Sequence, residues 1–149
     1  MADSARLIEN LLYVYAERMD AGDFIGVADL FAHGRIEASP EAKREDAAVG
    51  REGVLAMYRS AARLYEDGTP RTRHLISNAI IEVDDDEAHA TARTSYMVFQ
   101  QTEKLALQPI IGGHYHDTFH RPEGAWAFDT RIMFVDLVGD LSHHLLFDL

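Results

Sequence analysis

The chain has 149 residues and a formal net charge of −11, from 25 acidic and 14 basic side chains, so phosphate backbones and anionic membrane surfaces would repel it. It contains no cysteine, which excludes disulfides, thiolate metal sites and cysteine nucleophiles. No apolar run approaches the roughly 20 residues of a membrane span, and the N-terminal residues lack the apolar core of a signal peptide. We therefore expect a cytoplasmic protein with no nucleic-acid and no membrane partner.

The first half of the chain has the apolar spacing of helices. Over residues 4–19 apolar side chains recur every three or four positions, which predicts a helix that Ser4 caps. Gly22 suits the left-handed position at the end of this helix, and Asp23 can cap the helix that follows. The later segments expected in this half are helices at 24–32 and 51–66 and a strand fragment at 35–38.

From residue 71 onward the apolar period changes from about 3.6 to about 2, which is typical of β-strands. The long strands expected are 72–83, 88–102, 107–121 and 125–137. Turns at 84–87 and 122–124 join neighbouring strands and favour an antiparallel meander. Because the helices precede the strands instead of alternating with them, the pattern predicts an α+β fold, with a single domain over residues 1–149.

Polar side chains interrupt the apolar face of the predicted sheet. His74 and Asn78 share one parity in the first long strand, and Ile76 and Ile80 have the same parity. This places an imidazole and an amide among aliphatic groups. Arg131 lies in a last strand that is otherwise rich in aromatic residues. Since buried polar groups need partners, these side chains either face solvent or converge in a cavity.

Each candidate residue also has an ordinary structural explanation. Tyr15 could simply pack in the core, and Asp20 could be a solvated acid in the turn after the first helix. His74 could bond the backbone at the edge of the core, and Arg131 could pair with Asp129 or with an acid on a neighbouring strand. Taken singly, none of them indicates a function. A contact between Asp20 and His74 would favour an enzyme, whereas a solvent-facing Asp20 would argue against one.

Four segments match a family pattern in order and spacing: YAERMDAGDFIGVADLF (15–31), TRHLISNAIIEVDDDEAHA (72–90), GGHYHDTFHRPEGAWAF (112–128) and TRIMFVDLVGDLSHHL (130–145). Together they resemble the SnoaL-like branch of the NTF2-like superfamily. The resemblance covers essentially the whole chain. It implies a cone, in which a strongly curved antiparallel sheet wraps around helices and leaves an apolar interior cavity.

The resemblance is closest to the dehydratase-type members, such as scytalone dehydratase and bile acid 7α-dehydratase. It implies catalytic roles for Tyr15 and Asp20 on the first helix. It implies the same for His74 on the first long strand and Arg131 on the last. The second histidine of scytalone dehydratase falls at Gly112, so a pair of histidines is not matched. The side chains expected to contact a substrate are Met19, Phe31, Tyr58, Asn78, Met97, Phe99, His114 and Tyr115.

The activity that this resemblance implies is that of a dehydratase or isomerase that needs no metal or other cofactor. In it, His74 moves a proton and Asp20 fixes the tautomer of the imidazole. Tyr15 and Arg131 would stabilise a developing oxyanion on a small apolar cyclic hydroxy- or keto-compound. The alternative is a non-catalytic ligand-binding protein, or one similar to the small subunit of ring-hydroxylating dioxygenases. The family also implies a homodimer or homotrimer formed through the outer face of the sheet.

Overall fold

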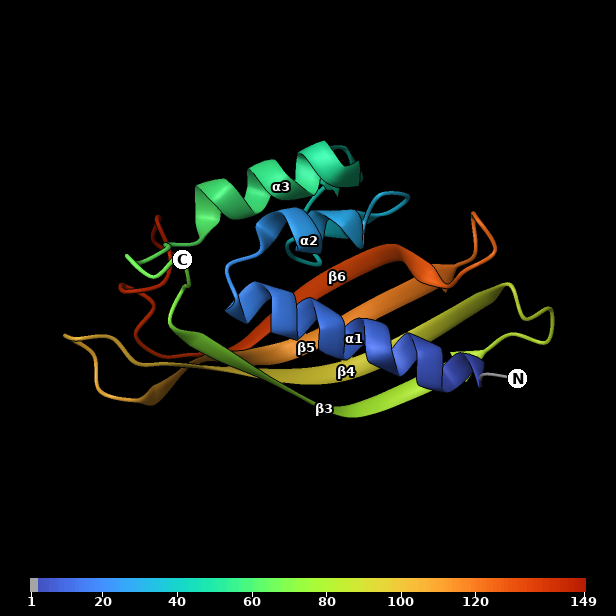
Figure 1. Cartoon of the computed structure of the whole chain (residues 1–149). Helices are drawn as coiled ribbons and strands as arrows, with labels where there is room; N and C mark the ends of the chain where they lie inside the picture. The colour runs from blue at the N-terminus through green and yellow to red at the C-terminus, as the bar shows by residue number, and fades with distance from the viewer. Residues whose placement is uncertain (1–2) are drawn as a thin grey trace.

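Residues 3–149 are described in a computed structural model of the chain (Figure 1). The helices are α1 (Ser4–Asp20), α2 (Phe24–Asp29) and α3 (Gly50–Ala61), with a short 3₁₀ helix, η1 (Arg44–Asp46). The strands are β1 (Arg35–Glu37), β2 (Ala48–Val49), β3 (Thr72–Val83), β4 (His89–Gln100), β5 (Gln108–His120) and β6 (Ala127–Val138). The six strands form one sheet in the order β2-β1-β6-β5-β4-β3. The predicted α+β class is confirmed.

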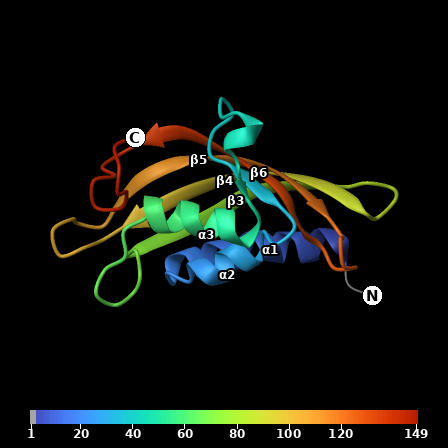
Figure 2. The same cartoon turned by 90° about the horizontal axis from the view of Figure 1, so that it is seen from above.

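The helices lie on one face of the curved sheet (Figures 1 and 2). Helix α1 runs along β3, while α2 and α3 pack on each other near β1 and β6. The four long strands form the expected antiparallel meander, and β1 adds to β6 in parallel. Among residues 3–149, no helix is long and apolar enough to cross a bilayer.

Two helix ends differ from the expectation. Asp3, rather than Ser4, caps α1, because its carboxylate accepts a hydrogen bond from a backbone N–H of the first turn. Helix α3 ends at Ala61, more than one turn earlier than the apolar spacing predicts. The next residue, Ala62, is extended and forms a β-bridge with Leu145 near the C-terminus. Pairing with a distant segment therefore ends the helix before its apolar pattern does.

A β-bulge at Asn78 changes which side chains of β3 face the helices. The pairing of β3 with β4 shifts between Ser77 and Ile80, and Asn78 has a φ angle of 56°. Asparagine tolerates this left-handed conformation better than most residues. Ile76 faces the core before the bulge, and Ile81 does so after it. The expectation that Asn78 and Ile80 share the inner face is therefore wrong, since both are exposed.

Arg131 on β6 and Asp117 on β5 form a buried ion pair in the core. The Arg131 side chain is 0% exposed, and its Nε and Nη2 donate to the two Asp117 oxygens at 2.8 and 2.9 Å. The guanidinium carbon lies 4.3 Å from the ring centroid of Tyr15 and 3.7 Å from that of Tyr115. Burial opposes the charge, but the Asp117 carboxylate offsets it and raises the pKa of Arg131 above its ordinary value. The partner of Arg131 is therefore an acid on the neighbouring strand, not Asp129.

This geometry predicts that the two partners stabilise the fold only together. Asp117→Leu leaves a buried guanidinium without its carboxylate, and we expect the free energy of unfolding to fall by about 3–5 kcal/mol. The double variant Asp117→Leu/Arg131→Met removes both charges and should recover most of this loss. Urea unfolding of the three proteins measures the difference. A double variant as unstable as the single one would contradict the coupling.

Candidate active site

The end of α1 meets the start of β3 through Asp20 and His74. Oδ1 of Asp20 lies 2.6 Å from Nδ1 of the His74 ring, and Oδ2 accepts the His74 backbone N–H at 2.7 Å. The Thr72 hydroxyl donates to Oδ1 at 2.9 Å. The His74 side chain is 6% exposed and that of Asp20 is 13% exposed. Asp20 is thus turned toward the strand rather than toward solvent.

The position of β3 in the sheet explains why Asp20 is needed there. Strand β3 is an edge strand, so the backbone N–H groups on its outer side have no strand to pair with. Asp20 satisfies one of them at His74. Helix α1 ends directly after Asp20, with Gly22 in the left-handed conformation at φ 72°. The carboxylate therefore bridges a helix end and an unpaired strand edge.

The contact with Asp20 decides which ring nitrogen of His74 can act on a ligand. A carboxylate that binds Nδ1 keeps the proton of the neutral ring on that nitrogen, which leaves Nε2 as an acceptor. Within residues 3–149, Nε2 has no hydrogen-bond partner. An open groove of about 510 Å³ between α1 and β3 reaches the pair. Its lining residues are Tyr13, Ala16, Glu17, Asp20, Arg73, His74, Leu75 and Ile76.

The C-terminal segment brings a second histidine toward this pair. After β6 the chain turns back against the segment that follows α3, where the backbone N–H of Arg63 donates to the His144 carbonyl at 2.8 Å. The His144 residue is only 8% exposed. Burial and then the nearby charge of His74 lower the pKa of His144 to about 4, although Asp20 opposes this. His144 is therefore uncharged at neutral pH.

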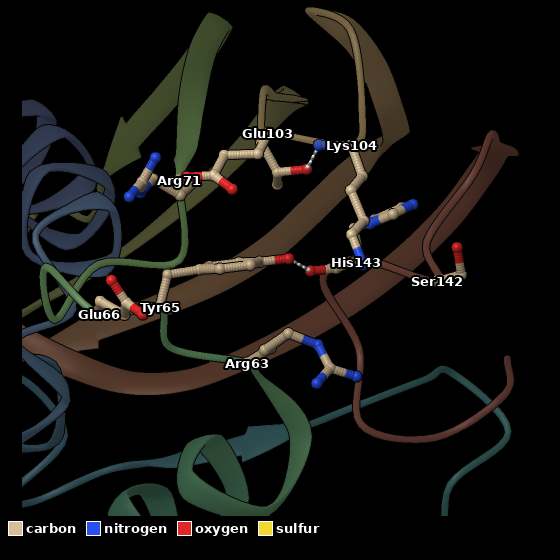
Figure 3. A pocket seen from close by; sticks show the side chains of 9 residues that line it. Arg63, Tyr65, Glu66, Arg71, Glu103, Lys104, Ser142 and His143 are labelled. Carbon is tan, nitrogen blue, oxygen red and sulfur yellow. Dashed lines mark hydrogen bonds between the residues drawn. The ribbon is translucent and has the colours of Figure 1, made fainter.

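His143, the preceding residue, lies on the outer side of the same turn (Figure 3). It lines an open surface hollow of about 380 Å³. The charged side chains around this hollow are Arg63, Glu66, Arg71, Glu103 and Lys104. The hydroxyl of Tyr65 donates to the His143 carbonyl, and Gln100 of β4 donates to the same oxygen at 3.1 Å. The turn thus presents one histidine to the surface and buries the other.

Tyr15 and Arg131 form a second polar centre. The hydroxyl of Tyr15 hydrogen-bonds that of Tyr58, and burial raises the pKa of Tyr15, so this group stays protonated. Two of the Arg131 nitrogens bind Asp117, and the buried Nη1 has no partner. Within residues 3–149, no hydrogen bond or ion pair joins this centre to Asp20. The four residues expected to be catalytic therefore form two separate pairs.

Half of the expected substrate contacts lie between the helices and the sheet: Met19, Phe31, Tyr58 and Tyr115. These side chains are buried, and the rings of Phe31 and Tyr115 meet that of Tyr15 edge-on at centroid distances of 6.3 and 6.0 Å. These rings therefore pack against Tyr15 in the core between the helices and the sheet. The opening that reaches the Asp20–His74 pair is the groove beside α1.

The other four residues expected to contact a substrate do not face the helices: Asn78, Met97, Phe99 and His114. Asn78 lies at the exposed bulge. In β4 the even-numbered residues are the buried ones, so Met97 and Phe99 face away from the helices. His114 lies on the same outer face, where it pairs with Asp136 at 2.6 Å. Aromatic and sulfur-containing side chains indicated burial, but strand parity decides the face.

Three residues around these centres were not identified from the sequence. Asp117 lies at the same strand parity as Tyr115 and Phe119 in β5. This alternation indicates that its carboxylate faces the core. Thr72 lies two residues before His74 and hence on its face. No local pattern predicts His144, because its position depends on contacts with the distant residues Arg63 and Ala61.

A group of three possible metal ligands in residues 3–149, Asp84, Asp86 and His89, lies in the turn between β3 and β4. All three are exposed, and Asp86 already binds the His89 ring at 3.0 Å. The turn is at the opposite end of β3 from His74. Asp86 and His89 are therefore not part of the site. They form an exposed aspartate–histidine pair with which Asp20 and His74 can be compared.

The depressed pKa of His144 predicts a pH dependence of stability. In the unfolded chain this group takes up a proton near pH 6.5, whereas in the folded protein it does so near 4. The unfolded state therefore binds more protons in this interval, and stability is lost as the pH falls through it. Between pH 7 and pH 5 we expect a loss of about 2 kcal/mol from this group, which His144→Phe should remove from the pH dependence. Urea unfolding of the parent protein and of His144→Phe at pH 7 and pH 5 tests this. If both proteins lose the same free energy of unfolding between the two pH values, the prediction is contradicted.

Relatives of known structure share this fold. No curated protein matches the chain in sequence. An NTF2-like protein with a cystatin-like fold from Novosphingobium aromaticivorans is 20% identical, with a TM-score of 0.70, over 94% of this chain and 86% of its own. A candidate scytalone dehydratase from the same organism is 22% identical, with a TM-score of 0.70, over 91% and 86%.

ActVI-ORFA from Streptomyces coelicolor is 20% identical, with a TM-score of 0.70, over 89% of this chain and 97% of its own. At these identities the likeness shows the fold and leaves the activity open. The curved sheet with helices on one face agrees with it. The family model of the SnoaL-like domain matches residues 2–132. The chain therefore belongs to the SnoaL-like family.

Proposed function

We propose that the protein is a cofactor-independent lyase or isomerase that moves a proton on a small apolar cyclic hydroxy- or keto-compound. The observation that carries the proposal is the 2.6 Å contact between Asp20 and Nδ1 of His74, which leaves Nε2 without a partner among residues 3–149, in a residue that lines a groove. An imidazole held in one tautomer by a carboxylate is suited to general acid–base catalysis at neutral pH.

In a dehydration, Nε2 of His74 takes a proton from the carbon next to a carbonyl group. The electrons of the broken C–H bond form an enolate, and the imidazolium is stabilised by Asp20 at 2.6 Å. The enolate then expels the β-hydroxyl group, to which the imidazolium returns the proton, so that water leaves. An isomerisation differs only in that the proton returns to another carbon. Neither reaction consumes an oxidant or a reductant.

The surroundings of the pair favour an apolar substrate with one polar end. Ala16 on α1 and Leu75 and Ile76 on β3 supply aliphatic surface along the groove. Glu17 and Arg73 supply charge at its sides. A cyclic hydrocarbon skeleton can pack against the first set while its carbonyl or hydroxyl group approaches Nε2 of His74.

Tyr15 and Arg131 have a supporting role in this proposal. The Tyr15 ring packs against the Arg131 guanidinium and the Tyr115 ring, and these contacts hold α1 against the sheet. A direct contact with substrate, through the Tyr15 hydroxyl or the unpartnered Nη1 of Arg131, requires the surrounding rings to move apart. Catalysis at His74 does not require this movement.

We predict that removing either member of the pair abolishes most of the activity. Asp20→Asn leaves the ring without its carboxylate, and His74→Gln removes the base. Each variant should lower kcat about 10²- to 10⁴-fold. The measurement is turnover of a panel of alicyclic and polycyclic hydroxy-ketones and steroid-like alcohols by the purified protein, followed by loss of the substrate and formation of the enone.

The matched control is His89→Gln, which removes an exposed histidine that also pairs with an aspartate. This variant should turn over substrate like the parent protein. Turnover unchanged in both Asp20→Asn and His74→Gln would exclude the pair as the catalytic centre. Binding of the same compounds without turnover by the parent protein would instead indicate a non-catalytic ligand-binding protein.

A further inference from the structure

Thr72, at the start of β3, is a buried residue whose hydroxyl group donates to Asp20. The residue is 8% exposed, and its Oγ1 lies 2.9 Å from Oδ1 of Asp20. The same carboxylate oxygen lies 2.6 Å from Nδ1 of His74. Thr72 and His74 are two positions apart on one strand, so their side chains leave it on the same face. One oxygen of Asp20 is therefore shared by a hydroxyl group and an imidazole.

The fold does not require this hydroxyl group. Oδ2 of Asp20 already joins the end of α1 to β3 through the backbone N–H of His74 at 2.7 Å. Thr72 also lies opposite Gln100 in the β3–β4 ladder, and such pairing uses main-chain groups. Valine has nearly the shape of threonine, is equally suited to strands and buries no polar group. Packing and strand pairing alone would therefore favour valine at this position.

The second donor changes what Asp20 can do for the imidazole. A carboxylate that binds only the ring stabilises the imidazolium and so holds the proton there. A hydrogen bond donated to the carboxylate stabilises its negative charge and weakens its interaction with other donors. In this site Oδ1 is shared with Thr72, and Oδ2 is bound to a backbone N–H. A base that takes up and releases a proton at neutral pH needs such a balance.

We infer that Thr72 is a positioning residue whose hydroxyl group limits how strongly Asp20 stabilises the protonated His74 ring, so that the ring can act as a base at neutral pH. This inference rests on the proposed function, because it concerns the base of the same reaction. Thr72 acts through Asp20 and takes no direct part in the proton transfer. Without the hydroxyl group, more of the carboxylate charge is left for the imidazolium, and the ring keeps its proton to a higher pH.

Other charged and titratable groups also surround His74. Tyr13 and Glu17 on α1 and Arg73 on β3 line the groove together with it. The charge of His74 also acts on His144 in the C-terminal turn. All of these groups are the same in the parent protein and in variants at position 72. A comparison of such variants therefore isolates the effect of the hydroxyl group.

The first experiment needs no substrate. The ring signals of His74, identified by their loss in His74→Gln, are followed by NMR between about pH 5 and 9 in the parent protein, in Thr72→Val and in Thr72→Ser. The pH at which half of the rings are protonated should rise by about 0.5–1 unit in Thr72→Val. Thr72→Ser keeps the hydroxyl group and should stay near the parent value. An unchanged or lower value in Thr72→Val, or an equal rise in Thr72→Ser, would overturn the inference.

The second experiment asks whether the change reaches the reaction. The acid limb of the pH profile of kcat/KM reports the protonation of the base in the free enzyme. In Thr72→Val this limb should move to higher pH by the same amount as the NMR value, so that kcat/KM on the limb falls about 3- to 10-fold. A merely structural role would lower the free energy of unfolding but move neither the NMR value nor the limb, and would overturn the inference.

Thr118→Val is the matched control, since it removes the hydroxyl group of another strand threonine that donates to an aspartate, Asp129. It should change neither the NMR value of His74 nor the pH profile. Thr72→Ala also lacks the hydroxyl group and should reproduce the rise, so the result does not depend on how valine packs. Should the parent protein turn over none of the compounds, the proposed function fails, and the NMR values still decide whether Thr72 acts on the Asp20–His74 pair.

Discussion

The buried pair of Arg131 and Asp117 is the constraint that links the register of the sheet to the position of the candidate site. An unpaired charge in this core would cost several kcal/mol, so β5 and β6 must keep the register that sets the two residues opposite each other. The guanidinium also lies against the ring of Tyr15 and so ties α1 to the sheet. Asp20 ends the same helix. The contact that fixes this register therefore also determines where the Asp20 carboxylate meets His74.

Most of the fold was predictable because its elements follow local rules. Apolar spacing placed α1 and the long strands to within a few residues, and Gly22 and Asp23 marked a true helix boundary. The errors arose where a distant contact overrides the local pattern. The bulge at Asn78 reverses strand parity, and the bridge at Ala62 ends α3. A short stretch of sequence predicts neither the register between two strands nor a β-bridge to a distant segment.

The candidate site was predictable in part for the same reason. Asp20 and His74 are joined by a contact that the resemblance to dehydratases implied, and the structure brings them within 2.6 Å. The same resemblance grouped them with Tyr15 and Arg131, which the structure instead places in a separate buried centre. The burial of His144 could not be predicted, because it depends on bonds between the folded C-terminal turn and the segment after α3. The residues next to His144 in the sequence show no pattern that indicates a buried histidine.

Asp20 also breaks a local rule, and this bears on its role. A carboxylate in the last turn of a helix opposes the helix dipole, which disfavours it by a few tenths to 1 kcal/mol. Three donors from β3 offset the penalty, two of them from His74 and one from Thr72. A neutral amide could accept the same backbone bond without opposing the dipole, so the fold alone does not require the charge. What the charge adds is stabilisation of a protonated His74 ring, which the proposed proton transfer would require.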